Sequence, residues 1–367
     1  MKNYHFCTNS VSGSNYNPRN IQYIPAVINF AFLDLAQNRS FFKGLNISGI
    51  RNNRVKIPLS VPAVGGLFPE EEIVLMNQYP GRKCSGTLFF VIFSDLDGTL
   101  LDHHTYEWQA ARPALNLCNR LKYPVVLVSS KTRAEMEILR DEMSISGPFV
   151  TENGGGVFIP PRPDVSPGSD ATGGACPQEM KKLSLGLPYP RLVAALREIR
   201  KELGLNLKGF SDMKVNEISR LTGLDPDSAR LAAMREYDEP FIILNEQPSD
   251  LAAVVQAAEK RGLTITTGGR FYHLQGGNDK GQAMDRVLSW YRQCHGNVAS
   301  VALGDSPNDF PMLERADFPV FVGVPKDAAA LTEKIPRLTV TPEQGPRGWN
   351  SAVQNILERY LNRPADG

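Results

Sequence analysis

The stretch that decides the fold is LFFVIFSDLDGT, residues 88–99, where an unbroken apolar run ends at Ser94 and is followed at once by Asp95 and Asp97. An apolar run without alternation predicts a strand covered on both faces, as in a parallel sheet flanked by helices. Ligands of such sheets bind beyond the carboxyl ends of the strands, so the two carboxylates are predicted to point into a binding crevice. Gly98 frees the backbone to turn sharply after them.

Similar apolar runs recur along the chain and alternate with segments of helical periodicity. We expect strands at residues 88–94, 124–130, 148–153, 300–305 and 318–323, and helices at 113–122, 132–143, 279–292 and 307–316. This alternation is typical of βα units and predicts an α/β fold with a mostly parallel sheet.

Two regions depart from this pattern. Residues 1–88 are rich in Asn, Ser and Gly and lack a sustained period, so we expect a poorly structured extension. Residues 156–276 read as an inserted α+β domain that splits the main domain into residues 89–155 and 277–367. The insertion opens with a Pro/Gly-rich loop, has helices expected at 191–203, 215–221, 228–234 and 249–261 and a strand at 241–246, and closes with a hairpin turning at Gly268-Gly269.

Composition excludes several classes of protein. The 40 Lys and Arg residues nearly balance 39 Asp and Glu, which argues against a nucleic-acid partner or an anionic membrane surface. No apolar run is long enough to cross a membrane, and the first residues lack a secretory signal. The five cysteines form no CxxC pair, so we expect unpaired thiols in a reducing cytoplasm.

A second acidic motif, GDSPND at residues 304–309, also follows an apolar strand and opens a helix. Its acids could merely cap that helix. Together with Asp95 and Asp97, however, Asp305 and Asp309 complete a set of oxygen ligands suited to Mg²⁺. The sequence therefore predicts a Mg²⁺ site at the strand ends.

Two further residues could complete a phosphate site. Ser129, at the tip of its strand, offers a hydroxyl and a backbone N–H to a phosphoryl oxygen. Lys280, at the start of a helix, offers a positive charge. Each is ordinary by itself, and their order between the two acidic motifs is the specific observation. A glycosyltransferase that holds a nucleotide sugar through an Asp-x-Asp motif, and a non-catalytic scaffold, are the alternatives from other classes; the former leaves Lys280 and GDSPND unexplained.

In this order, DLDGT, Ser129, Lys280 and GDSPND resemble the four motifs of the haloacid dehalogenase (HAD) superfamily of phosphatases. The resemblance implies a Rossmann-like, three-layer core. It implies that Asp95 attacks phosphorus, that Asp97 serves as acid and base, and that Ser129 and Lys280 hold the phosphate. Mg²⁺ would be held by the carboxylates of Asp95 and Asp305 and the backbone carbonyl of Asp97, with Asp309 in or near its shell.

The insertion between Ser129 and Lys280 occupies the position of the C2 cap found in the Cof-like branch. Strings such as SSKTRAEM, TENGGGVFIP and GPRGWN are similar to those of mannosyl-3-phosphoglycerate phosphatases, which implies a phosphorylated sugar as the substrate. Another sugar phosphate, such as glucosyl-3-phosphoglycerate or sucrose phosphate, is the alternative. The residues expected to contact this multiply anionic substrate are Ser130, Lys131, Arg133, Arg235, Arg270, His273 and Asn308.

Overall fold

The computed structural model describes residues 88–160, 180–268, 270–324 and 328–361. The extension predicted for residues 1–88 therefore lies almost wholly outside the described residues, as does the Pro/Gly-rich loop that follows residue 160. Within the described residues, no helix is both long and apolar enough to cross a membrane. The two cysteines found there, Cys118 and Cys294, are free thiols.

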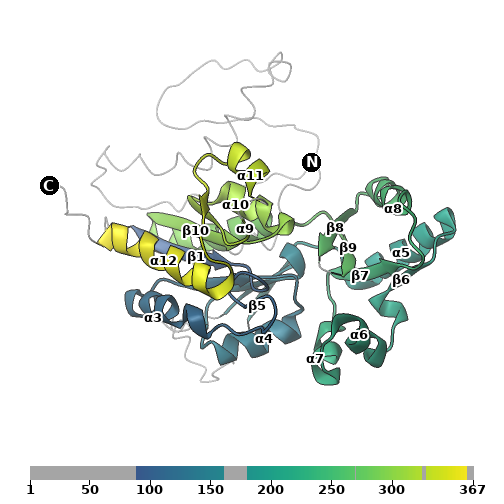
Figure 1. Cartoon of the computed structure of the whole chain (residues 1–367), viewed down its shortest axis with the longest axis horizontal. Helices are drawn as coiled ribbons and strands as arrows, with labels where there is room; N and C mark the ends of the chain where they lie inside the picture. The colour runs from purple at the N-terminus through teal and green to yellow at the C-terminus, as the bar shows by residue number, and fades with distance from the viewer. Residues whose placement is uncertain (1–87, 161–179, 269, 325–327, 362–367) are drawn as a thin grey trace, which may run out of the picture. The chain divides into compact units, whose positions relative to one another are not determined.

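Two sheets organise the described part of the chain (Figure 1). The main sheet has eight strands in the order β12-β11-β10-β1-β2-β3-β4-β5. These strands are β1 Phe89–Ser94, β2 Val125–Val128, β3 Phe149–Thr151, β4 Gly156–Ile159, β5 Lys181–Ser184, β10 Val298–Gly304, β11 Phe318–Phe321 and β12 Thr339–Val340. The six strands from β12 to β3 are parallel, whereas β4 and β5 are antiparallel additions at one edge.

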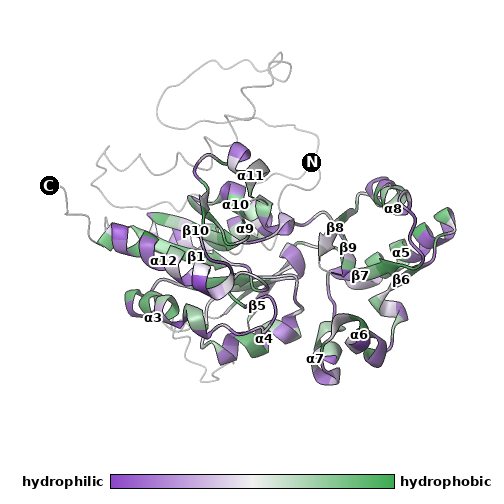
Figure 2. Cartoon of the chain, viewed as in Figure 1, coloured by the Kyte–Doolittle hydropathy of each residue, from purple (hydrophilic) through white to green (hydrophobic). Residues whose placement is uncertain are grey.

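The helices of the main domain cover both faces of this sheet. They are η2 Gln109–Ala111, α3 Arg112–Leu121, α4 Arg133–Glu142, α9 Lys280–His295, α10 Phe310–Arg315, α11 Ala329–Lys334 and α12 Gly345–Leu361, with the 3-10 turns η3 Glu152–Gly154 and η5 Pro307–Asp309. Phe90 and Ile92 of β1 join the core formed with α3, α4 and α12, while Val91 and Phe93 join the core on the other face with α9 and α10. Figure 2 shows the central strands as apolar and the helices as mixed, as a three-layer packing requires.

The second sheet has four antiparallel strands in the order β6-β7-β9-β8. Its elements are α5 Tyr189–Leu203, β6 Leu207–Gly209, η4 Phe210–Asp212, α6 Val215–Thr222, α7 Pro226–Ala232, β7 Asp238–Ile243, α8 Asp250–Glu259, β8 Thr264–Gly268 and β9 Phe271–Gln275. Phe241 and Leu274 pack on one face of this sheet with Leu192, Leu196 and Val254 of α5 and α8. The predicted α/β fold, with a mostly parallel main sheet and a separate α+β insertion, is confirmed.

Three local predictions need correction. The strands β4 and β5 were not predicted; they lie within the range 156–276 assigned to the insertion, yet they extend the main sheet. The strand predicted at 241–246 is β7, Asp238–Ile243, which begins and ends three residues earlier; its first residues, Asp238 and Glu239, are buried but polar, so an apolar pattern does not reveal them. In the hairpin, Gly268 pairs with Phe271 and is the last residue of β8, so it does not belong to the turn as predicted.

Candidate active site

Parallel pairing of β1 and β10 brings the two acidic motifs together. Ser94 lies opposite Leu303, and the N–H of Asp95 donates to the Leu303 carbonyl at 2.9 Å. The two strands therefore end side by side, with Asp95 and Asp305 following them. Gly98 has φ +82°, and a Cβ there would lie 2.5 Å from a carboxylate oxygen of Asp305. The glycine of DLDGT thus allows the loop to close over the second motif.

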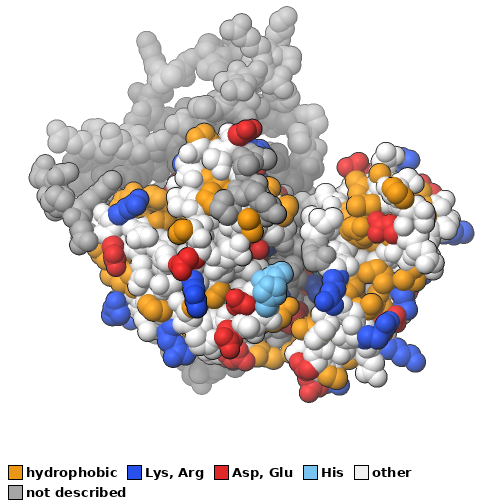
Figure 3. Space-filling model, viewed as in Figure 1, with side chains coloured by type: hydrophobic (Ala, Val, Ile, Leu, Met, Phe, Trp, Pro, Cys, Tyr) orange, Lys and Arg blue, Asp and Glu red, His pale blue; other side chains and the backbone are white. Residues whose placement is uncertain are grey.

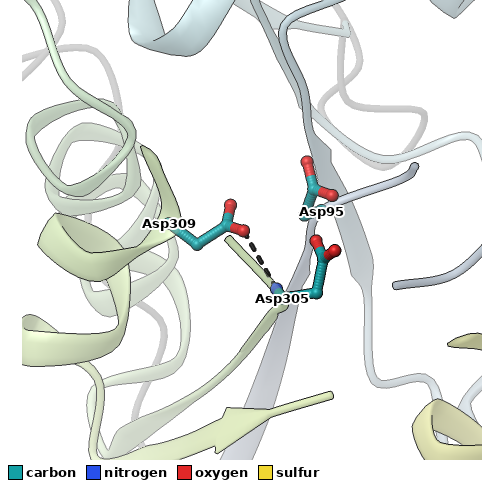
Figure 4. Close-up of side chains that lie close together, drawn as sticks. All are labelled: Asp95, Asp305 and Asp309. Atoms are coloured by element: carbon teal, nitrogen blue, oxygen red, sulfur yellow. Dashed lines mark hydrogen bonds between the residues drawn. The ribbon is translucent and has the colours of Figure 1, made fainter. Parts of the chain in front are cut away.

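A compact acidic cluster results from this arrangement (Figure 4). One carboxylate oxygen from each of Asp95, Asp305 and Asp309 lies within 4.8 Å of the others. The ammonium of Lys280, which is fully buried, donates to Asp95 at 2.5 Å and to Asp309 at 2.6 Å. The structure thus brings Lys280, predicted from a separate part of the chain, into contact with both acidic motifs.

The cluster carries more negative charge than Lys280 can offset. Burial raises the pKa of Asp95 well above its usual range; Lys280 opposes the rise, and Asp309 and Asp305 add to it. Burial and Asp309 likewise raise the pKa of Asp305 to about 6. Burial alone would lower the pKa of Lys280, but the two carboxylates that it contacts raise it. Three acids facing one ammonium are chemically matched to a divalent cation, and an all-oxygen set fits a hard one. The residues present therefore fit a metal site.

Asp309 differs from the other two acids in how fully it is bonded. Its second carboxylate oxygen accepts the backbone N–H groups of Asp305 at 3.0 Å and Ser306 at 3.1 Å. This is capping geometry at the start of η5, so the interpretation of GDSPND as a helix cap is correct for Asp309. Asp309 orients the loop that carries Asp305 and also anchors Lys280.

Asp97 lies outside the three-acid cluster and pairs with Lys131. The Lys131 ammonium is 2.8 Å from one Asp97 carboxylate oxygen. The other oxygen is buried and has no hydrogen-bond partner among the described residues. Burial alone would lower the pKa of Lys131, but Asp97 and Glu135 raise it, so Lys131 is a stable cation beside Asp97.

Ser129 lies at the end of β2, next to β1, with its side chain buried. Its backbone N–H donates to the Val150 carbonyl at 3.1 Å within the sheet. The expectation that this N–H is free for a phosphoryl oxygen is therefore wrong, because the β2–β3 pairing uses it. The hydroxyl accepts the N–H of Lys131 at 3.3 Å and keeps its own proton for donation.

The two buried cationic candidates of the insertion bond to the protein itself. Arg235 donates to the Ser130 carbonyl at 2.8 Å, which ties the loop before β7 to the residue after Ser129. His273 and Arg235 both contact the same oxygen of Asp238, at 2.7 Å and 3.3 Å. The side chain of Arg235 is 8% exposed. These residues form a buried network at the edge of the insertion.

The remaining candidates also have protein partners. Arg133 pairs with Glu137 one turn along α4 at 2.7 Å, and Arg270 donates to the Leu221 carbonyl at 2.8 Å. Asn308 donates to the side chain of Asn153 at 3.1 Å. The roles predicted for these residues toward a substrate stay predictions.

Glu152, a residue that we did not single out, connects the insertion to the main sheet. Its buried carboxylate accepts the backbone N–H groups of Glu236 at 3.0 Å and Tyr237 at 2.8 Å. Burial raises its pKa to about 7; Arg235 opposes the rise and Asp238 adds to it. Glu152 has the left-handed φ of +49°. The sequence signal for this contact is the glycine-rich string TENGGG. Its Gly155 lies so close to Tyr237 that a Cβ there would be 2.3 Å from the Tyr237 side chain.

The fold and the cluster place three carboxylates and a buried lysine at the carboxyl edge of a parallel sheet, an arrangement that fits a metal-assisted hydrolase. The family model of haloacid dehalogenase-like hydrolases matches residues 92–162. The chain is 40% identical to a glucosyl-3-phosphoglycerate/mannosyl-3-phosphoglycerate phosphatase of Methanococcoides burtonii over 275 residues, which are 74% of this chain and 98% of that one. It is 39% identical to the protein of the same name from Persephonella marina, covering 73% and 97%.

The chain therefore belongs to the haloacid dehalogenase-like phosphatases, in the Cof-like branch that the sequence motifs indicated. A HAD-superfamily phosphatase from Bacteroides thetaiotaomicron has the same fold, with a TM-score of 0.52 at 15% identity over 76% of this chain and 97% of that one. This membership decides against the glycosyltransferase and scaffold alternatives.

Proposed function

We propose that this protein hydrolyses the phosphate ester of mannosyl-3-phosphoglycerate and of glucosyl-3-phosphoglycerate, releasing the glycosylglycerate and phosphate. The observation that carries the proposal is the contact of Lys280 with Asp95 and Asp309 inside a three-acid cluster. The names of relatives that align over nearly their whole length supply the substrates.

In the proposed first step, a carboxylate oxygen of Asp95 attacks phosphorus while the bond to the glycerate oxygen breaks. The departing oxygen takes a proton from Asp97, and the phosphoryl group is left on Asp95 as an aspartyl-phosphate. We assign the proton to the Asp97 oxygen without a described partner, which is buried here and has to become accessible when the substrate binds. Lys131 remains beside the opposite oxygen and keeps the carboxyl group oriented.

In the second step, Asp97 accepts a proton from a water molecule whose oxygen attacks the same phosphorus. The bond between phosphorus and Asp95 breaks, and free phosphate leaves. Lys280 offsets the repulsion between Asp95 and the phosphate dianion, and the Ser129 hydroxyl donates to a phosphoryl oxygen. We propose Mg²⁺ as the metal, held by the carboxylates of Asp95 and Asp305 and the backbone carbonyl of Asp97, with Asp309 in or near its shell; it would stabilise negative charge on the transferring group.

We further propose that residues 189–275 act as a cap. A cap over the strand ends would exclude water and select the leaving group. The backbone contacts of Ser130 and Glu152 with residues 235–237 support a defined seat for it. Under this proposal Arg235 and His273 shape the cap, and Ser130, Lys131, Arg270 and Asn308 are the polar groups available to the substrate, whereas Arg133 is paired with Glu137.

The test is a comparison of kcat/KM for phosphate release in the presence of Mg²⁺. The panel contains mannosyl-3-phosphoglycerate, glucosyl-3-phosphoglycerate, sucrose phosphate and 3-phosphoglycerate. We expect the two glycosyl-3-phosphoglycerates to be preferred over the other two by at least about tenfold, which corresponds to about 1.4 kcal/mol of transition-state binding. A clear preference for sucrose phosphate or 3-phosphoglycerate would contradict the proposed substrates.

A further inference from the structure

The segment between β1 and η2 carries an aromatic side chain in an unfavourable backbone conformation. Tyr106 has a φ of +58°, and the residue is 51% exposed. A left-handed conformation costs a residue other than glycine about 1 kcal/mol, and an exposed ring recovers little of that by burial. Stability alone would favour Gly or Asn here, so the tyrosine needs another explanation.

The ring of Tyr106 contacts the lysine that pairs with the proposed acid and base. The Lys131 ammonium is 5.6 Å from the centre of this ring and 2.8 Å from the Asp97 carboxylate. A cation within about 6 Å of an aromatic ring is attracted to it. Lys131 therefore links the ring to Asp97, while about half of the tyrosine surface stays open to a ligand.

The leaving group of the reaction must also lie beside Asp97. A general acid has to come within hydrogen-bond distance of the oxygen that it protonates. The remainder of the leaving group then extends from Asp97 over neighbouring side chains, and Tyr106 and Lys131 are two of these. In a glycosyl-3-phosphoglycerate this remainder is a glycerate bearing a hexose.

A hexose presents C–H groups that pack well against the face of an aromatic ring, which is large, rigid and loses little entropy on binding. We propose that Tyr106 is the platform against which the hexose of the substrate packs, and so a specificity-determining residue for glycosylated over plain phosphoglycerate. The inference rests on the proposed function and adds to it a residue outside the four superfamily motifs.

The experiment compares Tyr106→Ala and Tyr106→Phe on two ligands that differ only by the sugar. Mannosyl-3-phosphoglycerate is the substrate, and 3-phosphoglycerate is measured as a substrate or, if it is not turned over, as a competitive inhibitor. For Tyr106→Ala we expect KM for the glycosylated substrate to rise about three- to tenfold, with kcat and the constant for 3-phosphoglycerate changed less than about twofold. Tyr106→Phe retains the ring and should behave as the wild type.

The matched control is Lys122→Ala at the end of α3. Lys122 is exposed and has a left-handed φ of +60°, so the substitution probes an equivalent backbone change away from the segment that carries Tyr106. It should leave both ligands unaffected. Equal weakening of both ligands by Tyr106→Ala, an unchanged KM, or a Phe variant as poor as the Ala variant would overturn the platform. A wild-type enzyme that hydrolyses neither glycosyl-3-phosphoglycerate would instead contradict the proposed function.

Discussion

The acidic cluster of the main sheet and the buried network at the edge of the insertion both contain buried acidic and basic side chains, but the two regions have different roles. At the cluster, one ammonium faces three carboxylates, and burial leaves Asp95 and Asp305 with raised pKa values. In the network, Arg235 and His273 share Asp238, and Arg235 also bonds to backbone carbonyls. Asp95 and Asp305 lack a full counter-charge where the chemistry is proposed, whereas Asp238 is paired with Arg235 and helps to hold the structure together.

The basic and acidic side chains on the surface differ in arrangement from those of the cluster and of the network. On the face shown in Figure 3, Lys and Arg alternate with Asp and Glu, and no large area of one sign is visible among the described residues. Exposed pairs of this kind contribute little to stability. Burial therefore distinguishes the charges of the cluster and of the network from exposed ion pairs, and substitutions can test their different roles.

The largest effect is expected for Asp95→Asn. The amide keeps the shape of the side chain but is not a nucleophile, so kcat should fall by about four orders of magnitude or more, the scale found when a catalytic nucleophile is removed. Phosphate release measures this loss, and the circular dichroism spectrum should match that of the wild type. Activity within about tenfold of the wild type would show that Asp95 is not the attacking group.

Lys280→Met, set against Arg235→Met, separates the two regions directly. Each substitution removes a buried cation, and each should lower the free energy of unfolding by about 3–5 kcal/mol, because it leaves carboxylates unpaired. Lys280→Met should also abolish measurable hydrolysis, since Asp95 loses its counter-charge. Arg235→Met should retain detectable kcat. Denaturant unfolding and phosphate release on the same preparations provide the test, and loss of kcat in both variants would erase the distinction.

The sequence was sufficient to predict the cluster because strand ends are fixed by topology. Apolar runs before Asp95 and Asp305 predict strands, and parallel strands place the residues at their carboxyl ends along one edge of the sheet. The capping box of Thr132 and Glu135 is a local feature of the same kind, since the two residues lie three apart. The cluster follows from the ends of the strands and the capping box from a spacing of three residues. Neither requires knowledge of a contact between residues that are distant in sequence.

The network could not be predicted because its partners are distant in sequence. Glu152 and Tyr237 meet through a side chain and a backbone N–H, a contact without a spacing rule. The strand β5, which pairs with β4, escaped prediction because Lys181–Ser184 has few apolar residues. A lone arginine or histidine is equally suited to a substrate or to a buried acid, and only the fold decides between them.

Glu152→Gln tests the network through pH. The pKa of Glu152 is about 7 in the folded protein and about 4.5 when unfolded, so the folded state holds the proton more tightly. The contribution of Glu152 to the free energy of unfolding is therefore complete below pH 4.5. It is lost as the pH rises to about 7, a decrease of about 3 kcal/mol in total. Glutamine keeps an acceptor for the N–H groups of Glu236 and Tyr237 but does not titrate.

The difference in unfolding free energy between wild type and Glu152→Gln, measured in denaturant at about pH 5 and about pH 8, should accordingly shift by about 2–3 kcal/mol in favour of the variant at the higher pH. The other titrating groups are the same in both proteins, so their contributions to the pH dependence cancel in this difference. A difference that stays constant between the two pH values would mean that Glu152 is ionised in the fold throughout and that its burial is compensated by Arg235.

The smallest effect is expected for Arg133→Ala, which removes an exposed, ion-paired residue close in sequence to the candidate active site. Arg133 follows Lys131 closely in sequence, yet its guanidinium pairs with Glu137 on the exposed side of α4 and lies 4.9 Å from the Phe158 ring centre. An exposed pair at this spacing is worth about 0.3–0.5 kcal/mol. We expect stability to fall by no more than about 1 kcal/mol, which includes the ring contact. KM should change less than about twofold, because a cation already paired on a helix surface has little charge to offer. Lys131→Ala is the matched comparison and should weaken turnover much more, since it removes the partner of Asp97. A several-fold rise in KM for Arg133→Ala with unchanged kcat would show that the substrate draws the guanidinium away from Glu137, and would place Arg133 among the residues that contact it.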